Sequence, residues 1–348
     1  MYFRKMNFLK VILSPFSIFY WIITSVRNAL FKFGLLNSYD SKIPVISVGN
    51  LSLGGTGKTP HVAYITSFLS QHNIAIISRG YGRKGKELII GDSTIHNAKN
   101  LGDEPMELLS KFEGFNFKMV VDGNRKRALQ YLENNYPNTE VVLLDDGFQH
   151  QYAKRNLNIL LSDFNKLFYQ DYIVPLGTLR ESREGANRAD AIIVTKCPSN
   201  LNVNEKNAIK QRIYNYTTAP VYFSKIEYNG FYNSKGKELN TNKKYLLISG
   251  IAKPKPIYQH LIEQEINFEK ETYSDHHNFS DNEINLLAKR SQLFDGIITT
   301  EKDWMRLKNT KLPTLTNKDI FRITIDIDFI DLEDKKQFNQ QITQTLNQ

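Results

Sequence analysis

The chain has 348 residues, of which 41% are hydrophobic and 23% charged; this composition excludes a wholly disordered protein, and the length allows two domains with a core in each. The single cysteine, Cys197, excludes an internal disulfide and is typical of a reducing compartment. The formal net charge of +9 indicates an anionic partner, which is a nucleic acid, a phospholipid surface or a phosphorylated substrate.

The first 36 residues combine apolar sequence with basic charge. No acidic residue precedes Asp40, and the apolar stretch at 11–23 is shorter than the roughly 20 residues that a membrane-spanning helix needs. No cleavage site of a secretory signal follows it. We therefore expect residues 1–36 to form a helix that lies in an anionic membrane interface, with a core helix packed on the next domain as the alternative. The basic residues of this segment are Arg4, Lys5, Lys10, Arg27 and Lys32.

Residues 45–59 have the pattern of a strand, a glycine-rich turn and the start of a helix. Glycines in such a turn let consecutive backbone N–H groups face a polyphosphate at the helix N-terminus. Lys58 would reach the β- and γ-phosphate oxygens, and the Thr59 hydroxyl would bind Mg²⁺. Because Ser52 replaces the first glycine of the usual pattern, a glycine-rich turn without a nucleotide is the alternative. The predicted nucleotide-binding residues are Ser52, Leu53, Gly54, Gly55, Thr56, Gly57, Lys58 and Thr59.

Two further segments place charged residues at the ends of predicted elements. The strand at 74–78 is followed by a basic, glycine-rich loop at 79–86, at the strand end where open α/β sheets bind ligands. A solvated turn is the alternative for this loop. The helix predicted at 101–109 begins near Asp103, which is either its N-cap or a general base, and sequence physics alone favours the cap.

Residues 140–150 carry the second nucleotide signature. Four apolar residues at 141–144 lead into Asp145 and Asp146, which is the pattern of a Walker B strand. Such a strand brings a carboxylate level with the Mg²⁺ of a nucleotide in the phosphate loop. Either aspartate would hold Mg²⁺, directly or through water.

Further strands at 157–163 and 191–195 complete the first sheet, and the loop at 175–181 brings Arg180 toward phosphate. The segment at 195–198 resembles the base-reading loop of GTP-binding proteins, but Pro198 replaces the aspartate that would accept hydrogen bonds from guanine. ATP is therefore the preferred nucleotide. The alternation of strands and helices predicts an α/β fold with a mainly parallel, doubly wound sheet of the P-loop NTPase type.

The second half of the chain predicts a connector and a smaller unit. Residues 221–236 look like an antiparallel hairpin, and a second α/β unit begins at 244. A polar loop in this unit contains His276 and His277, for which metal binding is an alternative although no further ligand stands nearby. The expected division is an interfacial helix at 1–36, a nucleotide-binding core at 37–218, a two-stranded linker at 219–243 and a smaller domain at 244–348.

With these segments in view, the chain resembles the tetraacyldisaccharide 4′-kinases, the ATP-dependent enzymes of lipid A assembly in Gram-negative bacteria. The resemblance runs nearly end to end and includes the serine at the entrance of the phosphate loop. After the apolar basic N-terminus, its motifs are Val48-Gly49-Asn50-Leu51 before Gly54-Gly55-Thr56-Gly57-Lys58-Thr59-Pro60, Arg79-Gly80-Tyr81-Gly82-Arg83, Gly102-Asp103-Glu104-Pro105, Asp145-Asp146-Gly147-Phe148-Gln149-His150, Leu176-Gly177-Thr178-Leu179-Arg180-Glu181, Asp275-His276-His277 and Thr300-Glu301-Lys302-Asp303.

The resemblance implies two α/β/α domains joined by a two-stranded linker, and an N-terminal helix that reaches a lipid substrate from the membrane interface. It implies transfer of the γ-phosphate of ATP, with Mg²⁺, to the 4′-hydroxyl of tetraacyldisaccharide 1-phosphate, an acylated glucosamine disaccharide lipid. The product would be lipid IV-A. The implied location is the cytoplasmic face of the bacterial inner membrane, with peripheral or monotopic attachment.

The resemblance also implies roles for single residues. Asp103 and His276 would form the pair that takes the proton from the sugar hydroxyl, with His277 as the second candidate. Lys58 and Mg²⁺ would offset the charge of the transferred group. If the histidine comes from the smaller domain, closure of the linker would assemble the base only when substrate is bound. The expected substrate contacts are Asn50, Arg79, Glu104, Arg125, Gln149, His150 and Arg180.

Two other functions share part of this pattern. A membrane-associated P-loop ATPase or nucleotide switch that acts on a protein partner would have the loop, the Walker B strand and the basic start, but it would not need the pair of Asp103 and a histidine. A nucleic-acid-dependent ATPase would explain the net charge. However, the N-terminal basic residues are interleaved with apolar sequence, which favours lipid, so we expect no nucleic-acid partner.

Overall fold

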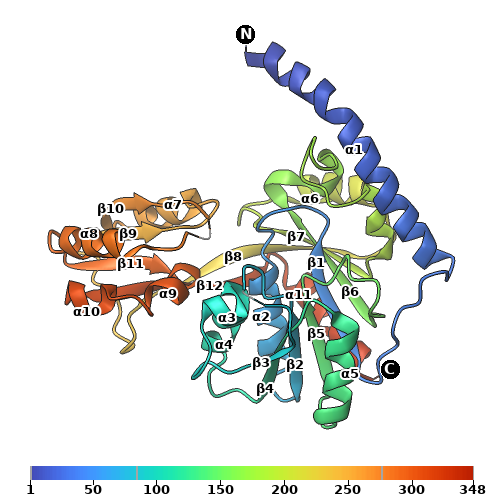
Figure 1. Ribbon diagram of the computed structural model, residues 1–348. Coiled ribbons are helices and arrows are strands. Elements are labelled where there is room, and N and C mark those ends of the chain that lie inside the picture. Colours follow the sequence, from blue (N-terminus) through green and yellow to red (C-terminus); the bar gives the residue numbers. More distant parts are fainter. Residues whose placement is uncertain (1, 84, 276, 348) are drawn as a thin grey trace.

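One sheet runs through the whole molecule in the computed structural model, which describes residues 2–83, 85–275 and 277–347, with side chains from Leu13 onward. Within these residues the strand order is β10-β9-β11-β12-β8-β7-β6-β1-β5-β2-β4-β3 (Figure 1). The strands are β1 (Val45–Asn50), β2 (Ile74–Ser78), β3 (Ile89–Gly91), β4 (Phe117–Val121), β5 (Val141–Asp145), β6 (Leu157–Asp163), β7 (Ala191–Thr195), β8 (Val221–Tyr232), β9 (Lys244–Ser249), β10 (Asn267–Thr272), β11 (Gly296–Thr300) and β12 (Asp319–Phe329). The helices are α1 (Tyr2–Lys32), α2 (Lys58–Phe68), α3 (Ala98–Leu101), α4 (Asp103–Lys111), α5 (Arg125–Asn135), α6 (Val203–Ile213), α7 (Lys255–Glu263), α8 (Asp281–Ser291), α9 (Glu301–Leu307), α10 (Leu312–Thr316) and α11 (Leu332–Leu346).

The larger unit has helices on both faces of a mainly parallel sheet. Strand β1 lies between β5 and β6, with Val48 opposite Asp145 and Ile159. Neighbouring residues of a strand point to opposite faces: Ile46 packs in a core with α2, α4 and α11, whereas Val45 packs in a second core with α5. The doubly wound sheet expected from the sequence is confirmed. Since parallel strands end at the same edge, the segments that follow β1 and β5 are neighbours.

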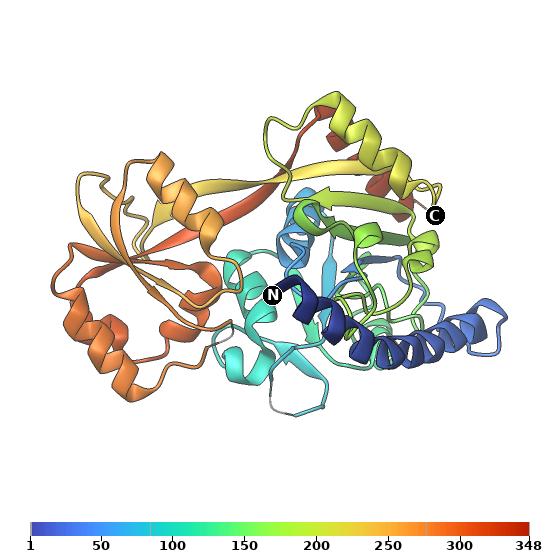
Figure 2. The same cartoon turned by 90° about the horizontal axis from the view of Figure 1, so that it is seen from above.

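Strands β8 and β12 form the long antiparallel ribbon that joins the two units (Figures 1 and 2). The first residues of β8 pair with β7 in the larger unit, and the first residues of β12 pair with β11 in the smaller unit. The hairpin expected at 221–236 is therefore wrong as the connector. The turn that follows β8 closes only a short bridge between Tyr232 and Glu238, because the long partner of β8 comes from 319–329.

The chain returns to the larger unit after β12. Phe338 and Ile342 of α11 belong to the same core as Val62 and Ile65 of α2. Because the last helix completes the first core, the expected C-terminal domain at 244–348 includes a segment that packs elsewhere. We propose instead a smaller unit at 244–318 inserted between the two linker strands; the divisions at 36 and 218 stay predictions.

The smaller unit contributes β10, β9 and β11, and the start of the linker strand β12 completes their parallel sheet, on which α7 to α10 pack. It lies beside the larger unit, and α9 contacts α4 there (Figure 2). The loop that follows β9 reaches the larger unit through Lys253, whose ammonium group lies 3.3 Å from Asp163. The two units therefore face each other across the carboxyl edge of the larger sheet.

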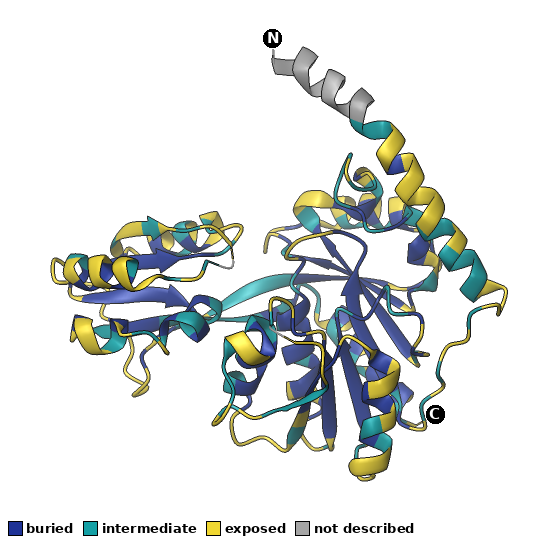
Figure 3. Ribbon diagram, in the orientation of Figure 1, coloured by how far each residue is buried: buried dark blue, intermediate teal, exposed yellow. Residues whose placement is uncertain are grey.

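Helix α1 lies along the outside of the larger unit and carries an exposed apolar surface (Figures 1 and 3). Ser17 and Asn28 point inward, since Ser17 Oγ donates to the Ile173 carbonyl at 3.2 Å and Asn28 Nδ2 donates to Glu181 Oε2 at 2.7 Å. The core-helix alternative is wrong for the exposed apolar residues between Phe16 and Val26. None of the helices that the structure describes combines the length and hydropathy needed to cross a membrane. The exposed apolar residues are Phe16, Ile18, Phe19, Tyr20, Trp21, Ile22, Ile23 and Val26.

Candidate active site

The phosphate loop connects β1 to α2, which begins at Lys58. Gly54 has φ of 105° and Gly57 has φ of 89°, conformations that residues with a Cβ rarely adopt. Lys58 is buried, and its Nζ lies 3.8 Å from Asp146 Oδ1. Thr59 is also buried. The strand, loop and helix are thus arranged as expected, with a helix N-terminus whose dipole favours an anion at Lys58.

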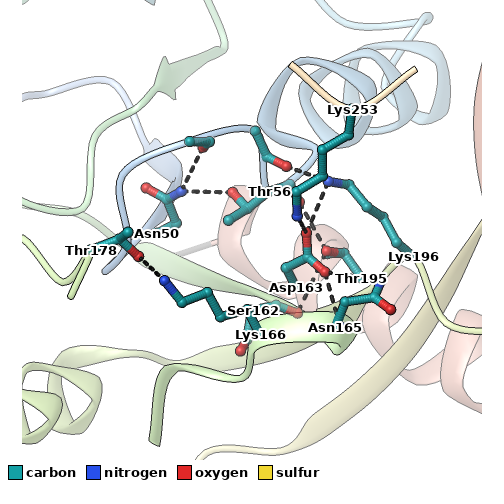
Figure 4. A network of polar contacts seen from close by, with 12 residues as sticks. Asn50, Thr56, Ser162, Asp163, Asn165, Lys166, Thr178, Thr195, Lys196 and Lys253 are labelled. Atoms are coloured by element: carbon teal, nitrogen blue, oxygen red, sulfur yellow. Dashed lines mark hydrogen bonds and ion pairs between the residues drawn. The ribbon is translucent and has the colours of Figure 1, made fainter. Parts of the chain in front are cut away.

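Side chains from neighbouring strands hold this loop in place (Figure 4). Asn50 Nδ2 at the end of β1 donates to Thr56 Oγ1 at 2.7 Å, and Thr195 Oγ1 at the end of β7 donates to the Thr56 carbonyl at 2.9 Å. Lys196 Nζ donates to the Gly55 carbonyl. Asn50, an expected substrate contact, is fully buried, so it supports the loop from below in this structure.

A cation from the smaller unit joins the same network (Figure 4). Asp163 Oδ2 lies 3.0 Å from Lys196 Nζ and 3.3 Å from Lys253 Nζ. Lys196 has φ of 57°, a left-handed conformation that is uncommon for a residue with a Cβ. One carboxylate therefore links the smaller unit, through Lys196, to the backbone of the phosphate loop.

Asp145 ends β5 beside this loop and suits a divalent cation. It is 1% exposed; Ser78 Oγ donates to its Oδ2 at 3.3 Å, and its Oδ1 has no hydrogen-bond partner among the described residues. Burial raises the pKa of Asp145, and the nearby Glu104 carboxylate raises it further. Across 2–83, 85–275 and 277–347, no group of three or more His, Cys, Asp and Glu side chains could hold a metal ion. A cation at Asp145 would thus take most ligands from phosphate oxygens and water.

Asp146 is held differently from its neighbour. Arg180 Nη1 donates to Asp146 Oδ2 at 2.9 Å. The backbone of Asp146 has a φ of 54°. Burial acts to raise the pKa of Asp146, but the charges of Lys58 and Arg180 outweigh burial, so the pKa is lowered. Gln149 Nε2 donates to the Asn50 carbonyl at 2.7 Å, which ties the segment after the Walker B strand to the start of the phosphate loop.

Arg125, Arg79 and His150 lie together near the two aspartates. Arg125 is 2% exposed; its Nη2 donates to the Asp145 carbonyl at 3.1 Å and its Nη1 to the Asp122 carbonyl, so it supports the end of β5. Burial lowers the pKa of Arg125 to about 10. Burial and the charge of Arg125 lower the pKa of His150 to about 3, so this imidazole is neutral at pH 7. Arg79 is exposed and close enough to lower both pKa values further.

Asp103 is the first residue of α4 and forms an ion pair across the two units. The N-cap position is occupied by Gly102, so the interpretation of Asp103 as the N-cap is wrong. Arg306 of α9 donates to Asp103 Oδ2 from Nη2 at 2.7 Å and from Nε at 3.0 Å. Arg306 also lies 3.3 Å from Asp303 Oδ1, which is fully buried. The candidate base is therefore held by a guanidinium from the smaller unit.

Of the two histidines of the polar loop, the structure describes His277. His276 lies outside the described residues, so its role stays a prediction. The ring of His277 packs against Tyr273 at a centroid distance of 4.7 Å, and its Nε2 lies 3.0 Å from Glu283 Oε1. These contacts engage the His277 ring with Tyr273 and Glu283, and its role as the second candidate for the base partner stays a prediction.

Sequence reasoning missed four charged residues of this region. Asp163 ends a predicted strand at the same edge of the sheet as Asp145, and this position alone would have indicated a residue near the phosphate loop. Glu181 follows Arg180 in a quoted motif; it is 2% exposed and accepts hydrogen bonds from Asn28 at 2.7 Å and Arg188 at 2.8 Å. Arg306 and Lys253 had no local signal, because only the packing of the two units brings them to Asp103 and Asp163.

Comparison with known proteins places the chain among enzymes of one kind. The tetraacyldisaccharide-1-P 4′-kinase (LpxK) family model matches residues 9–347. The tetraacyldisaccharide 4′-kinase of Flavobacterium psychrophilum is 43% identical over 98% of this chain and 100% of its own, and that of Bacteroides thetaiotaomicron is 37% identical over 95% and 91%. The crystal structure of the Aquifex aeolicus LpxK in complex with ATP superposes with a TM-score of 0.75 at 27% identity, over 97% of this chain and 99% of that one. This chain belongs to the tetraacyldisaccharide 4′-kinase family.

Proposed function

We propose that the protein transfers the γ-phosphate of ATP to the 4′-hydroxyl of tetraacyldisaccharide 1-phosphate, which forms lipid IV-A in lipid A biosynthesis. The observation that carries this proposal is the position of Asp103. Its carboxylate lies on α4 of the larger unit, in contact with Arg306 of the smaller unit. The next residue, Glu104, is close enough to the Walker B residue Asp145 for its charge to raise the pKa of Asp145. A nucleotide switch transfers no phosphate to an acceptor hydroxyl, so it does not need a carboxylate that acts as a general base.

The arrangement supports an in-line transfer in which each group has one task. Backbone amides of the loop bind the β-phosphate, and Lys58 offsets the charge of the γ-phosphoryl group. Thr59 and Asp145 would hold Mg²⁺, which supplies further positive charge to the phosphates when bound. Asp103, with His276 as its expected partner, takes the proton of the 4′-hydroxyl as the oxygen attacks. Arg306 keeps the Asp103 carboxylate oriented.

We also infer where the reaction takes place. The exposed apolar residues of α1 and the basic residues beside them support a peripheral or monotopic position on the anionic, cytoplasmic face of the bacterial inner membrane. A lipid acceptor would then be reached without leaving the bilayer. The same surface argues against nucleic acid as the partner of the basic charge.

The test is incubation of the full chain with ATP, Mg²⁺ and tetraacyldisaccharide 1-phosphate, with mass spectrometry of the lipid. A product one phosphate heavier is expected, and Lys58→Ala should abolish it. Asp103→Asn retains the shape of the side chain without its charge, so transfer should fall by about 10²–10⁴-fold while ATP binding is kept. Full-rate transfer by Asp103→Asn would remove Asp103 as the base, and ATP hydrolysis without any lipid product would favour the nucleotide switch.

A further inference from the structure

His61 makes two hydrogen bonds that the mechanism above does not use. It lies on α2, one turn after Gly57, and is 2% exposed. Its Nδ1 is 2.7 Å from the Gly57 carbonyl, and its Nε2 is 3.0 Å from Ser224 Oγ. Ser224 is fully buried on the linker strand β8. One imidazole therefore touches both the phosphate loop and the linker between the two units.

The chemistry of the partners fixes the tautomer of this ring. A carbonyl oxygen only accepts hydrogen bonds, so Nδ1 must carry the proton that is donated to Gly57. Burial lowers the pKa of His61 to about 4, so the ring is neutral at pH 7 and Nε2 is an acceptor. The Ser224 hydroxyl must then donate to Nε2. The result is a directed chain of hydrogen bonds from β8 through His61 to Gly57.

The bond to Gly57 fixes the direction of a backbone amide in the loop. In a trans peptide the carbonyl and the following N–H point in opposite directions. Since the Gly57 carbonyl points to His61, the N–H of Lys58 points away from the imidazole. Gly57 has a left-handed φ of 89°, and a residue without a Cβ restricts the conformation of its own backbone less than other residues do. Two hydrogen bonds hold the Gly57 carbonyl, one from the imidazole Nδ1 of His61 at 2.7 Å and one from the backbone N–H of His61 at 3.2 Å, and only the first depends on the side chain.

We propose that His61 is a positioning residue for ATP, which holds the Gly57–Lys58 peptide in the orientation that binds phosphate and anchors it to the linker strand through Ser224. This inference rests on the proposed function, because it takes ATP as the ligand of the loop. It assigns to the linker a second task besides joining the units, namely support of the nucleotide site.

The test compares ATP binding in the full chain and in variants with different parts of this contact. His61→Leu removes both imidazole hydrogen bonds and keeps the backbone bond to Gly57. The dissociation constant for a non-hydrolysable ATP analogue and the KM for ATP should rise about fivefold to tenfold, with little change in kcat. His61→Asn places an amide donor near the position of Nδ1 and should restore most of the affinity. Ser224→Ala keeps the bond to Gly57 but removes the hydrogen bond at Nε2, so a smaller rise in the dissociation constant and in the KM for ATP is expected.

Thr66→Val is the matched control for a purely structural effect. Thr66 is equally buried on α2, and its Oγ1 donates to the Val62 carbonyl of the same helix at 2.8 Å. This variant should lower the melting temperature without changing the affinity for ATP. Unchanged binding in His61→Leu, or an equal loss of affinity in Thr66→Val, would overturn the inference. If the wild-type chain itself bound no ATP analogue, the proposed function would fail along with it.

Discussion

At the scale of single residues, the candidate site separates two adjacent aspartates by their surroundings. Asp146 is paired with Arg180 at 2.9 Å and lies 3.8 Å from Lys58, whereas Asp145 is buried and its Oδ1 has no hydrogen-bond partner in the part of the chain that the structure describes. A paired carboxylate is already balanced by positive charge. At Asp145 the charges of Lys58 and Arg125 do not outweigh burial and the neighbouring carboxylates, so its pKa is raised, and a divalent cation would provide further positive charge.

We therefore expect the two aspartates to differ in their effect on Mg²⁺. Asp145→Asn should raise the Mg²⁺ concentration needed for half-maximal transfer by about tenfold or more. Asp146→Asn should mainly lower the maximal rate, since it weakens the positions of Lys58 and Arg180. Mg²⁺ titrations of both variants at saturating ATP measure the difference, and the opposite pattern would assign the metal to Asp146.

At the scale of elements, the contact between α4 and α9 carries several charges at the boundary of the two units. The Asp103–Arg306 ion pair stabilises it, while acidic residues of the same helices lie close to one another. Removal from water and the nearby Glu301 and Glu104 raise the pKa of Glu107 on α4 to about 8. The folded chain thus keeps a proton on Glu107 that the unfolded chain loses near the ordinary pKa of a glutamate, 4.5.

The sign of the resulting pH dependence follows from this difference. Between pH 4.5 and 8 the folded state binds more protons at Glu107 than the unfolded state, so the contribution of this residue to the free energy of unfolding falls as the pH rises. Glu107→Gln should remove this contribution, which gives little change in melting temperature at pH 5 and a higher melting temperature than wild type at pH 8. Glu113→Gln, an exposed glutamate just after α4, is the control. An unchanged pH profile in Glu107→Gln would show that the carboxyl group is ionised throughout.

At the scale of the whole molecule, three parts meet around one edge of the sheet. Helix α1 contributes an exposed apolar surface, the larger unit contributes the phosphate loop, and the smaller unit contributes Arg306 and Lys253. Asn28 of α1 connects the first part to the second: it donates to Glu181, which also accepts a hydrogen bond from Gln149 Nε2 at 3.1 Å. A lipid that enters along α1 would thus arrive at the edge where the nucleotide binds.

Vesicle binding tests the role of α1 at this scale. Replacement of Phe16, Phe19 and Ile23 by serine removes three exposed apolar side chains and should lower partition into anionic phospholipid vesicles by at least about tenfold, in a manner insensitive to salt. The control replaces Leu286 and Leu293, which are 68% and 78% exposed in the smaller unit, and should bind as wild type. Equal losses in both variants, or none in the first, would contradict a membrane-facing α1.

The parts of this protein that the sequence determined by itself are those encoded by neighbouring residues. The strand, glycine turn and helix at 45–69, the Walker B strand and the buried parallel strands all follow from periodicity, glycine conformation and apolar runs within short windows. For the same reason the turn at 233–236 led to the wrong prediction of a connecting hairpin: the turn is encoded by neighbouring residues, but the pairing of β8 with β12 is not.

Contacts between residues far apart in the chain depend on how the elements pack. Asp103 and Arg306 are 203 residues apart in the chain, and His61 and Ser224 are 163 apart. No window of sequence contains both members of either pair. Their contact depends on the order and register of the strands and on how the smaller unit packs against α4, and these are set by the burial of apolar surface from the whole chain rather than by local conformational preference.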